Sequence, residues 1–196
     1  MARVEHAFVV MSGLPGSGKT TLGRGIAAEL GLAMLDKDDI LDALLESLGP
    51  GDPGSRHRLR RASDAALQAI AVNTPAAVLS SFWRRERLSA TSGTPTDWLH
   101  GLPDTCLVEV HCVCPVALAV QRFQIRQRHP GHDDRRHTTE DLVHQFTRLE
   151  AEGPLGLGTL IRADTSQDLD AAIVAALSAV VVPHLDGQAA QRFIGG

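Results

Sequence analysis

The chain has 196 residues, a formal net charge of −4 and a pI near 6.1. The net negative charge excludes a general attraction to nucleic acid or to anionic membranes, so contact with a polyanion would need a local basic patch. With 43% hydrophobic residues the chain can bury one substantial core, and we expect a single domain over residues 1–196. It has no apolar run near the roughly 20 residues that span a bilayer and no signal-peptide layout, which predicts a cytoplasmic protein without a membrane partner.

Short apolar strands alternate with longer helices along the sequence. Residues 7–11 form a continuous apolar run, as expected of a strand buried on both faces of a parallel sheet. Further strands are predicted at residues 32–35, 76–80, 107–113 and 159–162. Helices are predicted at residues 20–30, 39–48, 55–72, 83–88, 116–128, 139–152 and 169–181. This alternation predicts an α/β fold in which a five-stranded parallel sheet has helices on both faces.

The sequence between the first strand and the first helix carries a phosphate-binding motif. The spacing G-x-x-x-x-G-K-[ST] begins at Gly13 and ends at Thr20. Glycines let consecutive backbone N–H groups turn toward a phosphate, Lys19 reaches the β- and γ-phosphates, and the Thr20 hydroxyl ligates Mg²⁺. The motif predicts binding of ATP with Mg²⁺, and an ordinary glycine-rich turn that binds nothing is the alternative. The predicted nucleotide-binding residues here are Gly13, Pro15, Gly16, Ser17, Gly18, Lys19, Thr20 and Thr21, with Thr20 as the metal ligand.

Acidic residues follow the second predicted strand, in the run Asp36-Lys37-Asp38-Asp39. The carboxyl end of a strand beside the phosphate loop is where a carboxylate can reach the γ-phosphate and accept the proton of an attacking hydroxyl. Asp38 fits that place, and Asp36 is positioned to support the Mg²⁺ shell through water. The alternative is that Asp38 only caps the helix that follows, which is a common use of aspartate. We favour the catalytic role because a cap needs one acid and this turn carries three.

Positive charge is concentrated between residues 122 and 137. The segment carries Arg122, Arg126, Arg128, Arg135 and Arg136, together with His129, His132 and His137. Arg122 and Arg126 share a helix face at a spacing of four residues, and Pro130-Gly131 interrupts the helix after them. The pattern predicts a basic helical lid over residues 122–137 that closes over the phosphates, where an arginine offsets the charge of the transferring group. A solvated basic helix end is the alternative.

Two further segments are candidates for the acceptor side. A basic group opens the third helix, at Arg56, Arg58, Arg60 and Arg61. It either faces an anionic substrate or lies on a solvated surface, and the sequence favours neither. Ser80-Ser81 and Trp83 follow the third strand, at the sheet edge where an acceptor should lie. Trp83 either forms an apolar wall of the acceptor pocket or packs as an ordinary core or surface tryptophan.

The three cysteines, Cys106, Cys112 and Cys114, are clustered and odd in number, which argues against a disulfide framework. Period-2 alternation predicts that Cys112 and Cys114 lie on one face of a strand, beside His111. A metal site and buried core thiols are both open alternatives. The absence of a second cysteine pair at ligand spacing favours core thiols.

Four segments, in this order, resemble small P-loop kinases of the AAA-like ATPase domain group, which includes chloramphenicol phosphotransferase and the kinase half of phage polynucleotide kinase. The segments are residues 13–21, 35–39, 122–132 and 163–166. The resemblance implies the P-loop NTPase fold, Asp38 as the general base, and Lys19 among the catalytic residues. It implies Arg126 ahead of Arg122 as the arginine that acts on the phosphoryl group. Asp164 and Thr165 are implied to contact the adenine, although a strand-to-helix cap would explain the same residues.

Two departures from the related kinases concern the acceptor. The polynucleotide kinases carry arginine three residues after the base, where this chain has Leu41, and the relatives often carry aspartate where this chain has Ser80 or Ser81. The sequence therefore predicts an ATP-dependent kinase that acts on a hydroxyl of a small molecule of antibiotic, sugar or nucleoside type, with nucleic acid not expected as a partner. A polynucleotide 5′-kinase and a non-kinase ATPase module that gates a partner are the alternatives. The oligomeric state stays open.

Overall fold

The computed structural model describes residues 5–84, 93–127, 129–132 and 137–185, whose strands form one sheet. The strands are β1 (His6–Gly13), β2 (Ala33–Asp36), β3 (Ala76–Ser80), β4 (Thr105–Val113) and β5 (Thr159–Asp164), in the spatial order β2-β3-β1-β4-β5. Every neighbouring pair is parallel, which confirms the predicted five-stranded α/β fold. Because β1 is the central strand, the loop after it opens at the middle of the sheet's carboxyl edge.

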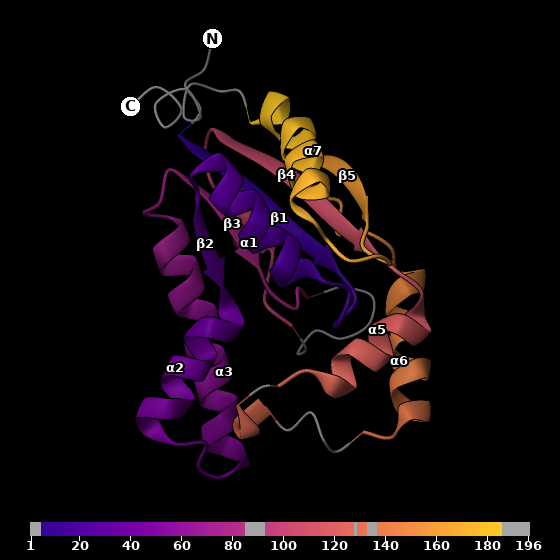
Figure 1. Cartoon of the computed structure of the whole chain (residues 1–196). Coiled ribbons are helices and arrows are strands. Elements are labelled where there is room, and N and C mark those ends of the chain that lie inside the picture. The colour runs from indigo at the N-terminus through magenta and orange to yellow at the C-terminus, as the bar shows by residue number, and fades with distance from the viewer. Residues whose placement is uncertain (1–4, 85–92, 128, 133–136, 186–196) are drawn as a thin grey trace.

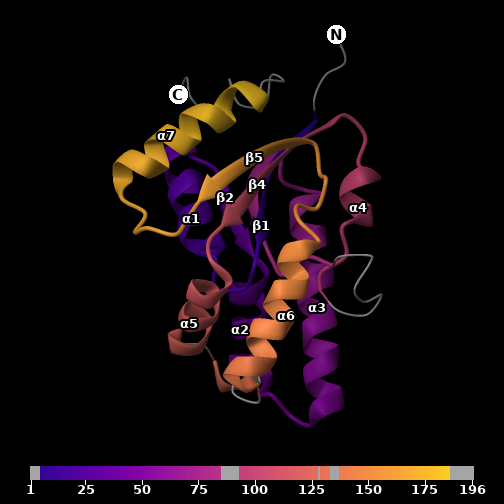
Figure 2. The same cartoon turned by 90° about the vertical axis from the view of Figure 1, so that its right-hand side faces the viewer.

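Helices cover both faces of the sheet (Figure 1). They are α1 (Lys19–Leu30), α2 (Lys37–Leu48), α3 (Pro53–Ala71), α4 (Asp97–His100), α5 (Val116–Ile125), α6 (Thr139–Ala151) and α7 (Ala171–Val181), with 3-10 turns η1 (Pro130–His132) and η3 (Val182–His184). Figure 2 shows α1 and α7 on one face and α3, α4 and α6 on the other. The pairs α2–α3 and α5–α6 stand on two sides of the carboxyl edge. Among the described helices, none has the length and apolar character needed to cross a membrane.

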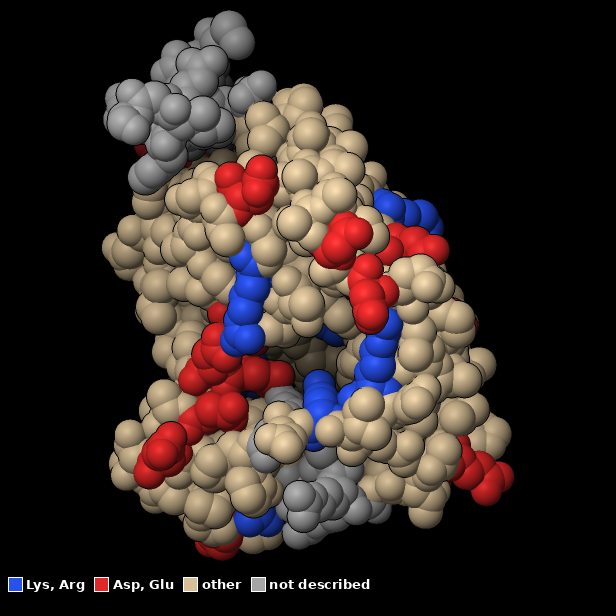
Figure 3. Space-filling model, viewed as in Figure 1, with Lys and Arg blue, Asp and Glu red and all other residues tan. Residues whose placement is uncertain are grey.

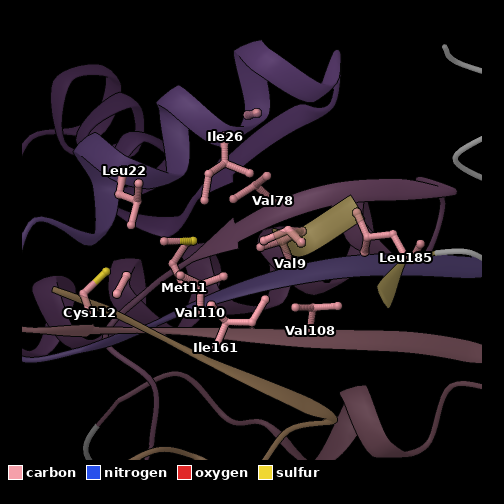
Figure 4. Close-up of a cluster of buried hydrophobic side chains, with 14 of the residues drawn as sticks. Val9, Met11, Leu22, Ile26, Val78, Val108, Val110, Cys112, Ile161 and Leu185 are labelled. Carbon is pink, nitrogen blue, oxygen red and sulfur yellow. The ribbon is translucent and has the colours of Figure 1, made fainter. Parts of the chain in front are cut away.

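The continuous apolar run of β1 is explained by burial on both faces of the sheet. Met11 packs with Leu22 of α1 in the cluster that Figure 4 shows. Phe8 packs with Leu67 of α3 in a second cluster on the opposite face. All four side chains have no exposed surface, so each contributes about 1.5–3 kcal/mol of transfer free energy relative to an exposed position. The phosphate loop therefore starts from a strand that is packed on both faces of the sheet.

Two differences from the predicted helices affect residues near the site. α5 ends at Ile125 instead of residue 128, because Arg126 has an extended backbone with ψ of 139°. The helix predicted at residues 83–88 is wrong where the structure describes it, since Trp83 forms an isolated β-bridge with Thr94. Residues 85–88 lie outside the described part of the chain. The first difference moves Arg126 off the helix, and the predicted shared face with Arg122 is therefore wrong.

The buried cysteines belong to two different core clusters. Cys112 packs with the cluster on the α1 side of the sheet, whereas Cys114 lies just beyond β4 and packs with the cluster of α5 and α6. The prediction that they share one strand face is therefore wrong. Burial raises the pKa of the Cys112 thiol to about 12, which disfavours the thiolate that a metal ion requires. Within the residues that the structure describes, no group of three or more His, Cys, Asp or Glu is placed to hold a metal ion.

A buried carboxylate joins β4 to the loop that leads into β5. Glu109 has no exposed surface and accepts hydrogen bonds from three successive backbone N–H groups, those of residues 155–157, at 2.7–3.1 Å. Ser12 Oγ donates to Glu109 Oε1 at 2.5 Å and lies 2.8 Å from His111 Nδ1. A buried carboxylate with this many donors is well satisfied. Because Ser12 precedes the phosphate loop, the network fixes the strand end from which that loop starts.

Candidate active site

The phosphate loop has a backbone that requires glycine. Gly13 has φ of 126°, and a Cβ there would lie 2.4 Å from the carbonyl oxygen of Cys112. Gly16 has φ of 78°, and a Cβ there would lie 2.2 Å from the carbonyl oxygen of Ala119 in α5. Any side chain at either position would be strained and would clash with backbone. The loop is thus wedged between β4 and α5, and it ends at the N-terminus of α1, whose partial positive charge favours an anion.

The last residues of the loop place a cation and a hydroxyl at its mouth. Lys19 Nζ donates to the carbonyl oxygens of Gly13 at 3.1 Å and Leu14 at 2.6 Å, which holds the ammonium group across the loop. Thr20 Oγ1 donates to Asp36 Oδ2 at 2.8 Å. Burial raises the pKa of Asp36, against the effect of its hydrogen bonds from the Asp38 backbone and from Thr20. This threonine and carboxylate supply the hard oxygen donors that Mg²⁺ prefers.

A cavity of about 1560 Å³ opens in front of the loop, and Figure 3 shows it as a hollow with acidic and basic side chains around its mouth. A single small-molecule site is typically about 300–1,000 Å³. The volume is therefore sufficient for a nucleotide and a second molecule together. The predicted site residues that line it are Pro15, Gly16, Gly18, Lys19, Thr20, Thr21, Asp38, Arg122, Arg126 and Thr165, whereas Gly13, Ser17 and Asp164 do not.

The three aspartates of the acidic turn differ in their contacts. Asp36 is the N-cap of α2, because its Oδ1 accepts the backbone N–H of Asp38 at 2.9 Å. Asp39 lies at the exposed rim of the cavity, where both of its oxygens accept from Arg24 Nη2 at 2.8 and 2.9 Å. Asp38 lies in the first turn of α2 and lines the cavity. Capping is thus done by Asp36, and the alternative in which Asp38 is the cap is wrong.

The two arginines predicted for the lid lie on the nucleotide side of the cavity. Arg122 of α5 donates to the carbonyl oxygens of Thr165 at 2.6 Å and Ser166 at 3.3 Å. The guanidinium of Arg126 lies 4.1 Å from the centre of the Phe123 ring, a cation–π contact. Three other arginines of the predicted lid, Arg128, Arg135 and Arg136, lie outside the described residues. α5 is therefore attached to the loop that follows β5.

The loop after β5 was predicted to hold adenine through Asp164 and Thr165. These two residues differ from each other in burial and position. Thr165 is buried, lines the cavity, and has its Cβ 3.6 Å from the position of a Cβ on Gly18. Asp164 is exposed, and a hydrogen bond from Ser166 lowers its pKa. The cap of α7 is Asp170, so the strand-to-helix cap by residues 164–166 is wrong. Thr165 is the residue that lies against the phosphate loop.

A stripe on one face of α3, polar except for Ala65, forms the opposite wall of the cavity. Its members are His57, Arg60, Arg61, Asp64, Ala65 and Gln68, whose spacing places them on one helix face. Arg56 and Arg58 lie outside this stripe, where Arg56 donates to the carbonyl oxygen of Gly51 and Arg58 donates to Ser55 Oγ. The basic group of α3 is thus divided between the cavity and the outer surface.

Two cavity residues, Lys37 and Asp64, were not among the predicted site residues. Lys37 Nζ lies 3.7 Å from Asp64 Oδ1, and the side chains are only 13% and 21% exposed. The same oxygen accepts a hydrogen bond from Thr94 at 2.7 Å, and Thr94 Oγ1 lies 2.5 Å from Ser81 Oγ. A carboxylate from α3 therefore stands beside Ser81. The i, i+3 and i+7 spacing of polar residues on α3 is the sequence signal that would have found Asp64.

Trp83 belongs to the core and does not line the cavity. Its side chain is 3% exposed and its indole Nε1 donates to the carbonyl oxygen of Met11 at 2.8 Å. Leu41, where the polynucleotide kinases carry arginine, is 3% exposed but, unlike Trp83, lines the cavity. The ordinary packing explanation therefore holds for Trp83, and the pocket-wall alternative is wrong.

The fold and this site define a P-loop kinase, a phosphotransferase with a hydroxyl acceptor, in agreement with known proteins. The family model described as AAA domain matches residues 8–151, and the chain belongs to that family.

Thermosensitive gluconokinase of Escherichia coli K12 is 28% identical over 157 residues, which cover 74% of this chain and 83% of that protein. A candidate kinase of Chloroflexus aurantiacus J-10-fl is 25% identical with a TM-score of 0.70, over 92% of this chain and 98% of that one. Shikimate kinase of Bacteroides thetaiotaomicron, 17% identical with a TM-score of 0.53 over 90% and 98% of the chains, has the same fold. The predicted resemblance to small P-loop kinases is confirmed.

Proposed function

We propose that this chain transfers the γ-phosphoryl group of ATP to a hydroxyl of a small polyhydroxylated anion of the sugar-acid type, with Asp38 as the general base. The observation that carries this proposal is the position of Asp38. It lines the cavity that Lys19 and Thr20 also line, and Asp36 relieves it of the capping role. A carboxylate at the junction of the nucleotide and acceptor sides is where proton transfer from the acceptor is required.

The transfer is an in-line displacement. Asp38 accepts the proton as the acceptor O–H bond breaks, and the acceptor oxygen forms a bond to the γ-phosphorus. The bond from that phosphorus to the bridging oxygen breaks, and ADP leaves with the electron pair. Asp38 then releases its proton to solvent. Since little covalent chemistry falls to the protein, its contribution is positioning and charge.

Cationic side chains offset the negative charge that spreads over the transferring group. Lys19 lies at the loop, Arg122 lies on α5 and Arg126 lies just after its end, and all three line the cavity. Donors that are already in place when charge develops contribute more than donors that must reorganise. Mg²⁺, when bound beside Thr20 and Asp36, would neutralise phosphate charge. Residues 122–137 act as the lid in this scheme.

The acceptor class is suggested by the composition of the second wall. Arg60, Arg61 and His57 of α3 face the cavity, which favours an anionic group on the acceptor. Asp64, held by Lys37 and Thr94, is suited to accept hydrogen bonds from acceptor hydroxyls. A polyhydroxylated carboxylate satisfies both kinds of group. The similarity to a gluconokinase supports the same class.

An acceptor panel tests this function. The purified chain is incubated with ATP and Mg²⁺ and with D-gluconate, other sugar acids, neutral sugars, nucleosides, hydroxylated antibiotics or an oligonucleotide with a 5′-hydroxyl. ADP formation and the mass of the product are measured. We expect a phosphorylated sugar acid and ADP formation well above the rate with water alone. Phosphorylation of only the oligonucleotide would replace the proposal by a polynucleotide kinase, and hydrolysis at the water level throughout would favour an ATPase module.

A further inference from the structure

The 3-10 turn η1 follows α5 in the chain but is held by contacts with α2 and α3. α5 is attached to the nucleotide side through Arg122 and Thr165. η1 lies beside α2 and α3 (Figure 1), and its His132 lines the same cavity. Residues 126–132 therefore connect the nucleotide side of the cavity with the acceptor side.

Three contacts hold η1 on these two helices. The imidazole Nε2 of His132 pairs with Asp42 Oδ1 of α2. Arg60 of α3 donates from Nη2 to the carbonyl oxygen of His132 at 3.1 Å. Gly131 lies so close to Leu45 that a Cβ would be 2.8 Å from a methyl carbon of that buried leucine. Side chain, backbone and packing thus all join the same turn to α2 and α3.

The His132–Asp42 pair is unlike a surface ion pair. The His132 side chain is 5% exposed and that of Asp42 is 43% exposed, so the imidazole has been taken out of water to reach its partner. Because the imidazole is buried, loss of Asp42 leaves it without this partner, and the cost of an unsatisfied buried polar group is larger than the net contribution of the bond. A turn held in this way dissociates more slowly than one held by exposed charges.

We propose that η1 is the latch of the lid and that His132 is the positioning residue that holds it closed on α2 and α3. Asp42 follows Asp38 by four residues, so both project from the same face of α2. Closing the latch therefore joins α5 to the helix that carries Asp38. A nucleotide bound at the phosphate loop then leaves only when η1 separates from α2. The inference depends on nucleotide binding and not on the identity of the acceptor.

Release of a fluorescent nucleotide tests the latch. The full chain is loaded with mant-ADP and Mg²⁺, mixed rapidly with excess unlabelled ATP, and the release rate is recorded. We expect His132→Ala and Asp42→Ala each to speed release about tenfold, and the double variant to add little to either single one, since the two residues act as one pair. His132→Gln, which keeps a neutral N–H donor, should restore part of the slow release.

Matched controls separate a latch from a general structural role. His144 of α6 lies 4.0 Å from Glu140 but its side chain is 78% exposed, so His144→Ala should leave release unchanged. Gly131→Val pushes η1 off Leu45 without altering His132, and it should also speed release. Thermal unfolding of each variant shows whether the fold is retained. Unchanged release in His132→Ala and Gly131→Val, with both variants folded, would overturn the latch.

Discussion

The nucleotide half and the acceptor half of the cavity take their chemistry from different parts of the chain. On the nucleotide side, the backbone and side chains of residues 13–20 form the binding loop within one contiguous segment. On the acceptor side, α2, α3 and residues 80–82, 84 and 93–95 contribute groups that are distant in sequence. A contiguous backbone site can keep its function while its surroundings change, whereas a site of scattered side chains can change specificity one residue at a time. The following substitutions test whether the halves are separable in this way.

The largest combined loss, in nucleotide affinity as well as in kcat, is expected at the loop, and the chain has one lysine on each side of the cavity. Lys19→Ala removes the cation nearest the phosphates, so we expect weaker nucleotide binding and a kcat lower by about 10²–10³. Lys37→Ala is the matched control, because Lys37 pairs with Asp64 on the acceptor side. Its nucleotide affinity should stay within about twofold of the original. Fluorescent nucleotide titration and ADP formation measure the two quantities, and equal loss of affinity in both variants would contradict separable halves.

At the junction of the halves, Asp38→Asn should lower the transfer rate by about 10²–10⁴ while nucleotide affinity is kept. The variant should also retain its stability, because Asp36 and not Asp38 caps α2. Asp39→Asn is the neighbouring control, since Asp39 and Arg24 form a surface pair of small energetic value. Single-turnover phosphoryl transfer and thermal unfolding are the measurements. A stability loss in Asp38→Asn as large as its activity loss would argue for a structural role.

On the acceptor wall, Arg61→Gln should raise the acceptor KM about tenfold with little change in the KM for ATP, because a charged hydrogen bond contributes about 1.5–3 kcal/mol. Arg58→Gln is the control on the same helix, where Arg58 bonds to Ser55 outside the cavity. The measurement is steady-state kinetics with the best acceptor from the panel. If Arg58→Gln changed the acceptor KM as much as Arg61→Gln, the division of α3 into a cavity stripe and an outer face would be wrong.

The contrast between a contiguous loop and scattered side chains also explains which features could be predicted from the sequence. The five-stranded parallel sheet and the loop at Gly13 follow from local patterns, namely apolar runs and glycine spacing, and both were predicted, whereas the order of the strands was not. The contact between Asp64 and Thr94 joins residues 30 positions apart through the packing of α3 on the sheet, and no local pattern contains it. Arg126 was placed on a helix because arginine and its neighbours favour helix, whereas the chain becomes extended there as it leaves α5. Tertiary contacts therefore decided the structure around Arg126 and Asp64, whereas the local sequence was sufficient to predict the phosphate loop.

The smallest effect concerns the cysteines, which report on the nucleotide half alone. Cys112 lies opposite Gly13 in the β1–β4 register, and its buried thiol, with a pKa of about 12, reacts with a disulfide reagent only after local opening. Mg·ADP at four times its Kd should slow labelling of Cys112 about fivefold, since only the closed form binds. Cys106 at the other end of β4, partly exposed, should label at an unchanged rate and serves as the internal control. Mass spectrometry of timed samples assigns each site. If an acceptor alone slowed Cys112 to the same extent, the two halves would open as one unit, and their separate origins in the sequence would not make them independent in the folded protein.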